Sequence, residues 1–219
     1  SRCTQTEANA NTQNPIMPII FVGENTEVIL TDYLPALSAE DEVVFTTEPS
    51  YQVSNVTAEG FTLNGDHTLS VLGVDVPAKG LHYDIPIVPQ SQYEVGLVTK
   101  SFSDSTITLA VLNQYEHLQF RVFWQDTRAK ELVEYGQYDT EAIIAIEPAW
   151  RESKGRSFIR VYAYADGKHL NDLLIPMQDG KVVNDVAELT RFDDHAQILY
   201  SLMIDRFYNG NKKNDWKMN

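Results

Sequence analysis

The chain has 219 residues, 43% of them hydrophobic, and a formal net charge of −14. That length can bury one large core or two small ones. The charge excludes a basic face that would neutralise phosphates, so we expect no nucleic-acid partner and no attraction to an anionic membrane surface. No apolar run reaches the roughly 20 residues of a membrane-spanning helix. A single cysteine, Cys3, excludes an internal disulfide.

The first 15 residues are polar, and they contain little that could pack into a core. Cys3 stands at the head of CTQTEANANTQNP, and two interpretations are open. One is a flexible tether whose cysteine is lipidated after removal of a signal peptide. It predicts export and anchoring at the periplasmic or cell-surface side of a bacterial outer membrane. The other is a disordered terminus with an incidental thiol, which Arg2 favours because a lipidation site usually has a small residue there.

From residue 16 to about 184, short apolar runs alternate with turn signals. Typical runs are TEVIL, EVVFTT, TITLAVLN, LQFRVFWQ and SFIRVYAYA, and the turns include NGDH, ADGK and QDGK. Many short strands at this spacing predict an all-β fold of antiparallel sandwiches. We expect Pro86 and Pro89 to interrupt strand pairing and mark the join. We therefore predict two tandem immunoglobulin-like β-sandwich domains, at residues 16–90 and 91–187.

Alternation within the run SFIRVYAYA assigns its side chains to two faces. The core face carries Ile159, Val161 and Ala163. The outward face carries Phe158, Arg160, Tyr162 and Tyr164. An outward aromatic row could stack on sugar rings, because pyranoses present an apolar face. The alternative, which we favour, is that the neighbouring domain covers this row.

Carbohydrate-binding candidates follow from the same stacking argument. Trp150 lies in the turn-like segment EPAWRESKG, flanked by charges, so we expect it to be exposed. The full set of candidates is Trp150, Tyr162, Tyr164, Tyr135 and Tyr138. The sequence has no nucleophile elbow, phosphate-binding loop or HExxH zinc motif, and its five histidines lack ligand-like spacing.

A polar segment, DVAELTRFDDHAQ, leads into an apolar run at residues 198–204. This run is apolar on both faces, which predicts a strand buried on both sides, as in a parallel sheet. Parallel partners require long crossovers, so we expect them to lie beyond this chain. In the chain alone, we expect the run to dock on a sandwich edge or to pair with a second copy.

The stretch QILYSLMIDRFYNGNKKND resembles the start of the catalytic barrel in the alpha-amylase family, glycoside hydrolase family 13, of the Bacteroides type. The matching positions are Asp205-Arg206-Phe207, Asn209-Gly210-Asn211, Lys212-Lys213 and Asn214-Asp215. The resemblance implies that residues 188–219 are a linker and the first strand of a (β/α)8 barrel. It also implies a parent enzyme that hydrolyses α-glucosidic bonds with retention, using carboxylates on later strands. No catalytic residue of the family can be placed on this chain.

The loop after this strand is rich in side-chain oxygens. Its candidate calcium ligands are Asn209, Asn211, Asn214 and Asp215. The resemblance implies that some family members bind calcium here and complete the site from a later loop. We therefore expect weak or no calcium binding by this chain, and no other cofactor. Calcium remains an option for the full-length parent, and a solvated turn is the alternative.

Together with the predicted sandwiches, the resemblance implies a non-catalytic N-terminal region of an amylase-like α-glucan hydrolase. Its domains would bind α-glucan, or they would only space and dock their own catalytic barrel. The alternative is a free-standing, surface-attached carbohydrate-binding or adhesion module.

Overall fold

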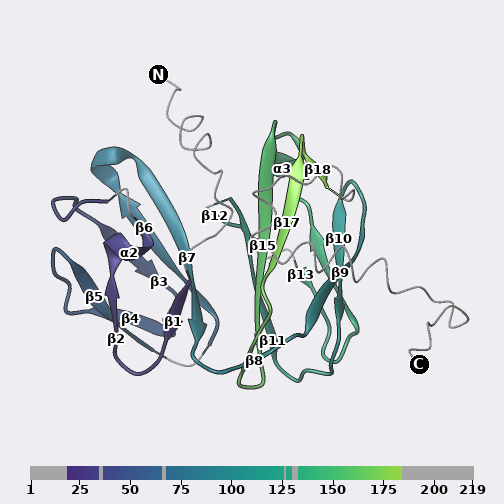
Figure 1. The fold of residues 1–219 in the computed structure, drawn as a ribbon, viewed down its shortest axis with the longest axis horizontal. Coiled ribbons are helices and arrows are strands. Elements are labelled where there is room, and N and C mark those ends of the chain that lie inside the picture. The colour runs from purple at the N-terminus through teal and green to yellow at the C-terminus, as the bar shows by residue number, and fades with distance from the viewer. Residues whose placement is uncertain (1–18, 35–36, 66–67, 126, 130–132, 184–219) are drawn as a thin grey trace, which may run out of the picture.

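The computed structural model describes residues 19–34, 37–65, 68–125, 127–129 and 133–183 (Figure 1). The predicted tether with Cys3, the apolar run at 198–204 and the Asn/Asp-rich loop lie outside these residues. None of the helices within the described ranges has the length and apolar character needed to cross a membrane.

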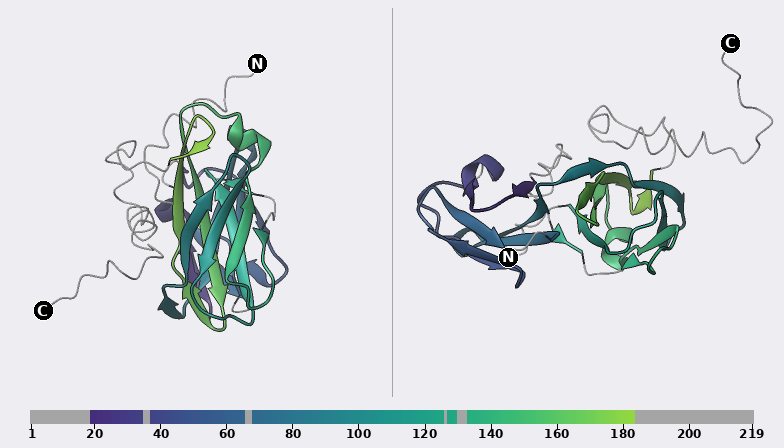
Figure 2. Two further views of the ribbon diagram at one scale, coloured as in Figure 1. Left: turned by 90° about the vertical axis from the view of Figure 1, so that its right-hand side faces the viewer. Right: turned by 90° about the horizontal axis from the view of Figure 1, so that it is seen from below.

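The described chain consists mostly of β-strands, so the predicted all-β class is confirmed. Its helical elements are short: α2 (Leu30–Tyr33), the 3-10 turn η1 (Pro77–Lys79) and α3 (Pro148–Arg151). The strands form two sets that pair only among themselves, one ending at Pro89 and the other beginning at Gln92. The right-hand view of Figure 2 shows these two units side by side.

The first unit has two sheets. One has the strand order β1 (Ile20–Val22), β7 (Leu81–Pro89), β6 (Ser70–Val76) and β3 (Val44–Thr47). The other has the order β2 (Thr26–Ile29), β5 (Gly60–Gly65) and β4 (Tyr51–Ser54). All neighbours are antiparallel except β1 and β7, which are parallel. Apolar side chains of both sheets meet in one core that contains Ile20, Leu72 and Ile85 from the first sheet and Val28 and Leu63 from the second.

The second unit also has two sheets around one core. One runs β12 (Thr127–Arg128), β11 (Leu118–Trp124), β15 (Arg156–Ala165), β16 (Lys168–Leu170) and β8 (Gln92–Glu94). In the same sheet, β17 (Leu173–Gln178) pairs with the first half of β15 and with β18 (Lys181–Val182). The facing sheet runs β13 (Val133–Glu134), β14 (Glu141–Ala145), β10 (Thr106–Val111) and β9 (Leu97–Phe102).

The predicted faces of β15 are confirmed, because Ile159, Val161 and Ala163 all lie in the core of the second unit. The expectation that the prolines of β7 interrupt pairing is wrong. Pro86 lies opposite Val71 of β6, and Pro89 lies opposite Val22 of β1. A proline removes only its own N–H, so the ladder bonds of its neighbours persist.

A buried asparagine fixes the point where the chain crosses from β8 in one sheet to β9 in the other. The Asn171 Oδ1 atom accepts hydrogen bonds from the backbone N–H groups of Gly96 (2.8 Å) and Leu97 (3.0 Å). Its Nδ2 atom donates to the Leu97 carbonyl at 2.7 Å. The side chain therefore satisfies three backbone groups that would otherwise be buried without partners.

On the β6–β7 hairpin, His82 lies between two carboxylates. Its Nδ1 atom is 2.7 Å from Asp75 Oδ1, and its Nε2 atom is 2.9 Å from Asp84 Oδ1. Partial burial lowers the pKa of His82, but the hydrogen bond to Asp75 and the charges of Asp84 and Asp75 outweigh it. The net effect raises the pKa of His82 above its ordinary value of 6.5. The protonated imidazole therefore stabilises the folded state.

We expect the substitution His82→Gln to cost stability in a pH-dependent way. The contribution of His82 is fully present below its unfolded-state pKa and is lost as the pH rises through the higher folded-state pKa. Urea unfolding of both proteins should show a larger loss at about pH 5.5 than at about pH 8.5. Equal losses at the two pH values would contradict this assignment.

Candidate functional site

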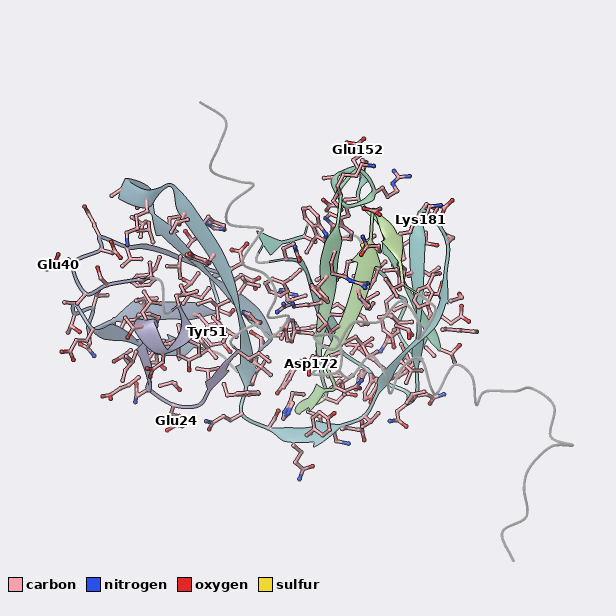
Figure 3. The ribbon with its side chains drawn as sticks, turned by 45° about the horizontal axis from the view of Figure 1, so that its top comes forward. Glu24, Glu40, Tyr51, Glu152, Asp172 and Lys181 are labelled. Atoms are coloured by element: carbon pink, nitrogen blue, oxygen red, sulfur yellow. The ribbon has the colours of Figure 1, made fainter. Side chains whose placement is uncertain are left out.

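The five predicted sugar-binding residues lie at three separate places. Trp150, on α3, is only 2% exposed and stacks on Trp124, with ring centroids 6.4 Å apart and 23° between the planes. The expectation that Trp150 is exposed is therefore wrong. The short helix turns its indole into the core, while the charged neighbours Arg151 and Glu152 remain exposed. Figure 3 shows Glu152 at the top of the second unit.

The outward row of β15 meets the first unit. Tyr162 is 5% exposed and packs edge-to-face on Phe123, with ring centroids 5.4 Å apart and 87° between the planes. The inter-unit cluster comprises Leu69, Val71 and Val88 from the first unit and Phe123 and Tyr162 from the second. Burial raises the pKa of Tyr162 to about 12. The neighbouring unit thus covers Tyr162, as the alternative interpretation of the row predicts.

Tyr164 lies at the margin of this cluster and packs against it while half-buried. Burial raises the pKa of its phenol. Tyr164 is directly opposite His169 of β16 in the antiparallel ladder, so the two side chains share the outward face of the sheet. The aromatic row therefore continues across the sheet beyond the covered region.

Two polar contacts between the units accompany the inter-unit cluster. The Arg121 guanidinium donates from Nε to Glu48 Oε1 at 3.1 Å and from Nη2 to Glu48 Oε2 at 2.9 Å. The Arg121 and Glu48 side chains are 14% and 22% exposed, respectively. The Leu69 N–H also donates to Gln119 Oε1 across the interface, at 3.3 Å. A two-pronged ion pair of this kind fixes orientation as well as distance.

Tyr135 and Tyr138 lie in the turn between β13 and β14. Beside this turn is an open groove of about 380 Å³, lined by Glu134, Tyr135, Gly136, Asp139, Thr140, Glu141 and Ile143. Tyr138 is the most exposed of the five candidates, at 50%, and has a left-handed φ of 64°. Tyr135 packs its ring on Phe120, and burial, followed by the charges of Asp139 and Asp166, raises its pKa.

The sequence does not predict another group of aromatic residues, which lies where the two units join. We call Phe21, Tyr93 and His169 the junction aromatic group. The His169 ring centroid is 5.8 Å from that of Phe21 and 5.2 Å from that of Tyr93. Phe21 comes from β1, Tyr93 from β8 and His169 from β16. No local sequence signal brings these three short strands together, because only strand pairing and the inter-unit contact do so.

The junction includes a serine–histidine contact that serves to hold the chain in place. Ser91 Oγ is 3.2 Å from His169 Nδ1, and it donates to the Pro89 carbonyl at 3.0 Å. The same oxygen accepts a hydrogen bond from the His169 N–H at 3.1 Å. These contacts tie the hydroxyl to the end of β7 and to β16. Within the described ranges, no group of three or more His, Cys, Asp or Glu could hold a metal ion.

Comparison with known proteins assigns no family. No family model and no curated protein match the chain. Among solved structures, one match is an endo-fucoidan hydrolase from glycoside hydrolase family 107, with a TM-score of 0.23 and 10% sequence identity. The match covers 74% of this chain and 27% of that protein's chain. At that TM-score it supports no statement about fold or function.

We expect Trp150→Ala to act on stability and not on sugar binding. Removing a buried, stacked indole should lower the free energy of unfolding by about 3–5 kcal/mol. The control Tyr138→Ala removes a half-exposed ring and should change it by only about 0.5 kcal/mol. Urea unfolding would measure both. A Trp150→Ala protein as stable as the control would show that the indole is not part of the core.

Proposed function

We propose that the two units form a non-catalytic accessory region of an amylase-like α-glucan hydrolase, and that they hold its catalytic barrel in a fixed position. The enzyme class in this proposal comes from the resemblance of residues 197–215 to the start of such a barrel. The role of the units comes from the inter-unit contact, which is the observation that carries the proposal.

The inter-unit contact favours a rigid spacer over a flexible tandem. Five apolar side chains pack across it with exposures of 5% or less, and a two-pronged Arg121–Glu48 ion pair borders them. Only Gln90 and Ser91 separate β7 from β8, and both are hydrogen-bonded to neighbouring strands. Units joined in this way keep one relative orientation, which is what a spacer needs to position an attached domain.

The same contact argues against glucan binding by the centre of the outward row. Stacking on a sugar requires one free ring face, and Tyr162 is only 5% exposed. The acid-lined groove beside Tyr135 and Tyr138 remains open, but Tyr138 does not line it. Spacing and docking of the barrel are therefore the roles that the geometry supports best.

We further infer that both units are immunoglobulin-like. In such a fold, strands A, B, E and D form one sheet and C, F and G form the other. Assigning β9, β10, β14 and β13 to A, B, E and D, and β11, β15 and β17 to C, F and G, reproduces that order in the second unit. In the first unit, β2, β5 and β4 fit B, E and D, and β3, β6 and β7 fit C, F and G.

Three parts of the proposal concern the barrel or residues outside the described ranges. The barrel would supply the two carboxylates of a retaining glycosidase from its later strands. The loop of Asn209, Asn211, Asn214 and Asp215 would contribute to a calcium site only together with a later loop. Export and lipid anchoring through Cys3 would place the enzyme at a bacterial outer membrane.

The coding region that follows Asn219 tests the proposal. We expect it to continue for about 250 or more residues of alternating strands and helices, with carboxylates at strand ends. The longer product should hydrolyse soluble starch with retention at the anomeric carbon, whereas residues 1–219 alone should not. An immediate stop codon would contradict the proposal and favour a free-standing binding or adhesion module.

A further inference from the structure

We propose that the junction aromatic group, Phe21, Tyr93 and His169, is a binding platform for a neutral oligosaccharide, formed jointly by the two units. The platform would give the accessory region a ligand of its own. We choose an α-glucan as the first probe, and this choice rests on the proposed function. The platform itself rests on the geometry of the three rings.

The two outer rings of the platform are open to solvent. Phe21 is 44% exposed and Tyr93 is 52% exposed, although each packs against the His169 ring on one side. Neither ring stacks flat on the imidazole, because the interplanar angles are 62° for Phe21 and 53° for Tyr93. An exposed aromatic ring is a surface on which the apolar side of a pyranose ring can stack.

Regular strand pairing holds the rings in place. Tyr93 is directly opposite His169 in the parallel β8–β16 ladder, and Phe21 is opposite Val88 in the parallel β1–β7 ladder. Val88 belongs to the inter-unit cluster, so the platform is continuous with that interface. The contact between Ser91 Oγ and His169 Nδ1 orients the imidazole. Because the rings are already ordered, a ligand loses little free energy in arranging them.

The charges near the platform favour a neutral ligand. The Glu94 carboxylate is paired with the Tyr115 hydroxyl at 2.6 Å and with Lys168 Nζ at 3.3 Å. The chain as a whole carries a formal charge of −14. Sulfated or uronic polymers would be repelled by this charge, whereas a neutral glycan would not.

The size of the platform favours a sugar over a folded protein partner. A stable protein interface involves about 20–30 residues on each side. The junction aromatic group offers three rings, with the charged pair Glu94 and Lys168 next to them along β8 and β16. Rings with polar tips, such as phenol and imidazole, also suit a ligand that has an apolar face and hydroxyl groups at its rim.

Isothermal titration calorimetry of the full chain with maltoheptaose tests the proposal. We expect Tyr93→Ala and Phe21→Ala each to raise the Kd about tenfold, and Tyr93→Phe to raise it much less, because the ring is retained and only the hydroxyl is lost. Tyr138→Ala is the matched control, since Tyr138 is as exposed as Tyr93 (50% against 52%) but lies in the β13–β14 turn. Urea unfolding would establish that each variant is folded.

Three results would overturn the proposal. One is the absence of binding to maltoheptaose and to matched xylan and mannan oligosaccharides. Another is loss of binding in Tyr138→Ala with retention in Tyr93→Ala, which would place the site at the β13–β14 turn instead of at the junction. The third is a concentration-dependent dimer that Tyr93→Ala abolishes, which would make the rings a self-contact. Binding of a xylan or mannan oligosaccharide through Tyr93, without maltoheptaose binding, would support the platform but contradict the α-glucan assignment.

Discussion

The structure depends on the burial of Tyr162 and Phe123 against Leu69, Val71 and Val88. Two large aromatic side chains of the second unit are buried against three aliphatic side chains of the first. This burial of apolar surface is the main force that holds the units in contact. The Arg121–Glu48 pair at the border fixes the orientation of that contact. The position of Phe21 beside His169 follows from it, because the two residues belong to different units.

The sequence predicts strand faces well, because alternation is a local property. The core side of β15 is confirmed residue by residue in Ile159, Val161 and Ala163. The sequence could not decide what covers the opposite side, since Tyr162 would look the same on a free surface and in an interface. Charged neighbours do not show that a residue is exposed. Trp150 is flanked by charges, yet a single turn of helix directs its ring into the core.

The junction aromatic group could not be predicted from local pattern at all. Its three residues belong to strands of three residues each, which are too short to show alternation. They meet only because β8 and β16 pair in parallel and because the first unit places β1 alongside. The first unit thus covers Tyr162, in the aromatic row that the sequence predicts on β15. The exposed aromatic residue Tyr93 lies further along the same sheet, on β8.

We infer from the inter-unit contact that the two units behave as one rigid body. Backbone ¹⁵N relaxation of the whole chain tests this claim most directly, since it reports a rotational correlation time for each unit separately. We expect the same correlation time for residues 20–89 and 92–182, and separate, shorter times in the Tyr162→Ala variant. Separate, shorter times in the unmodified chain would contradict it.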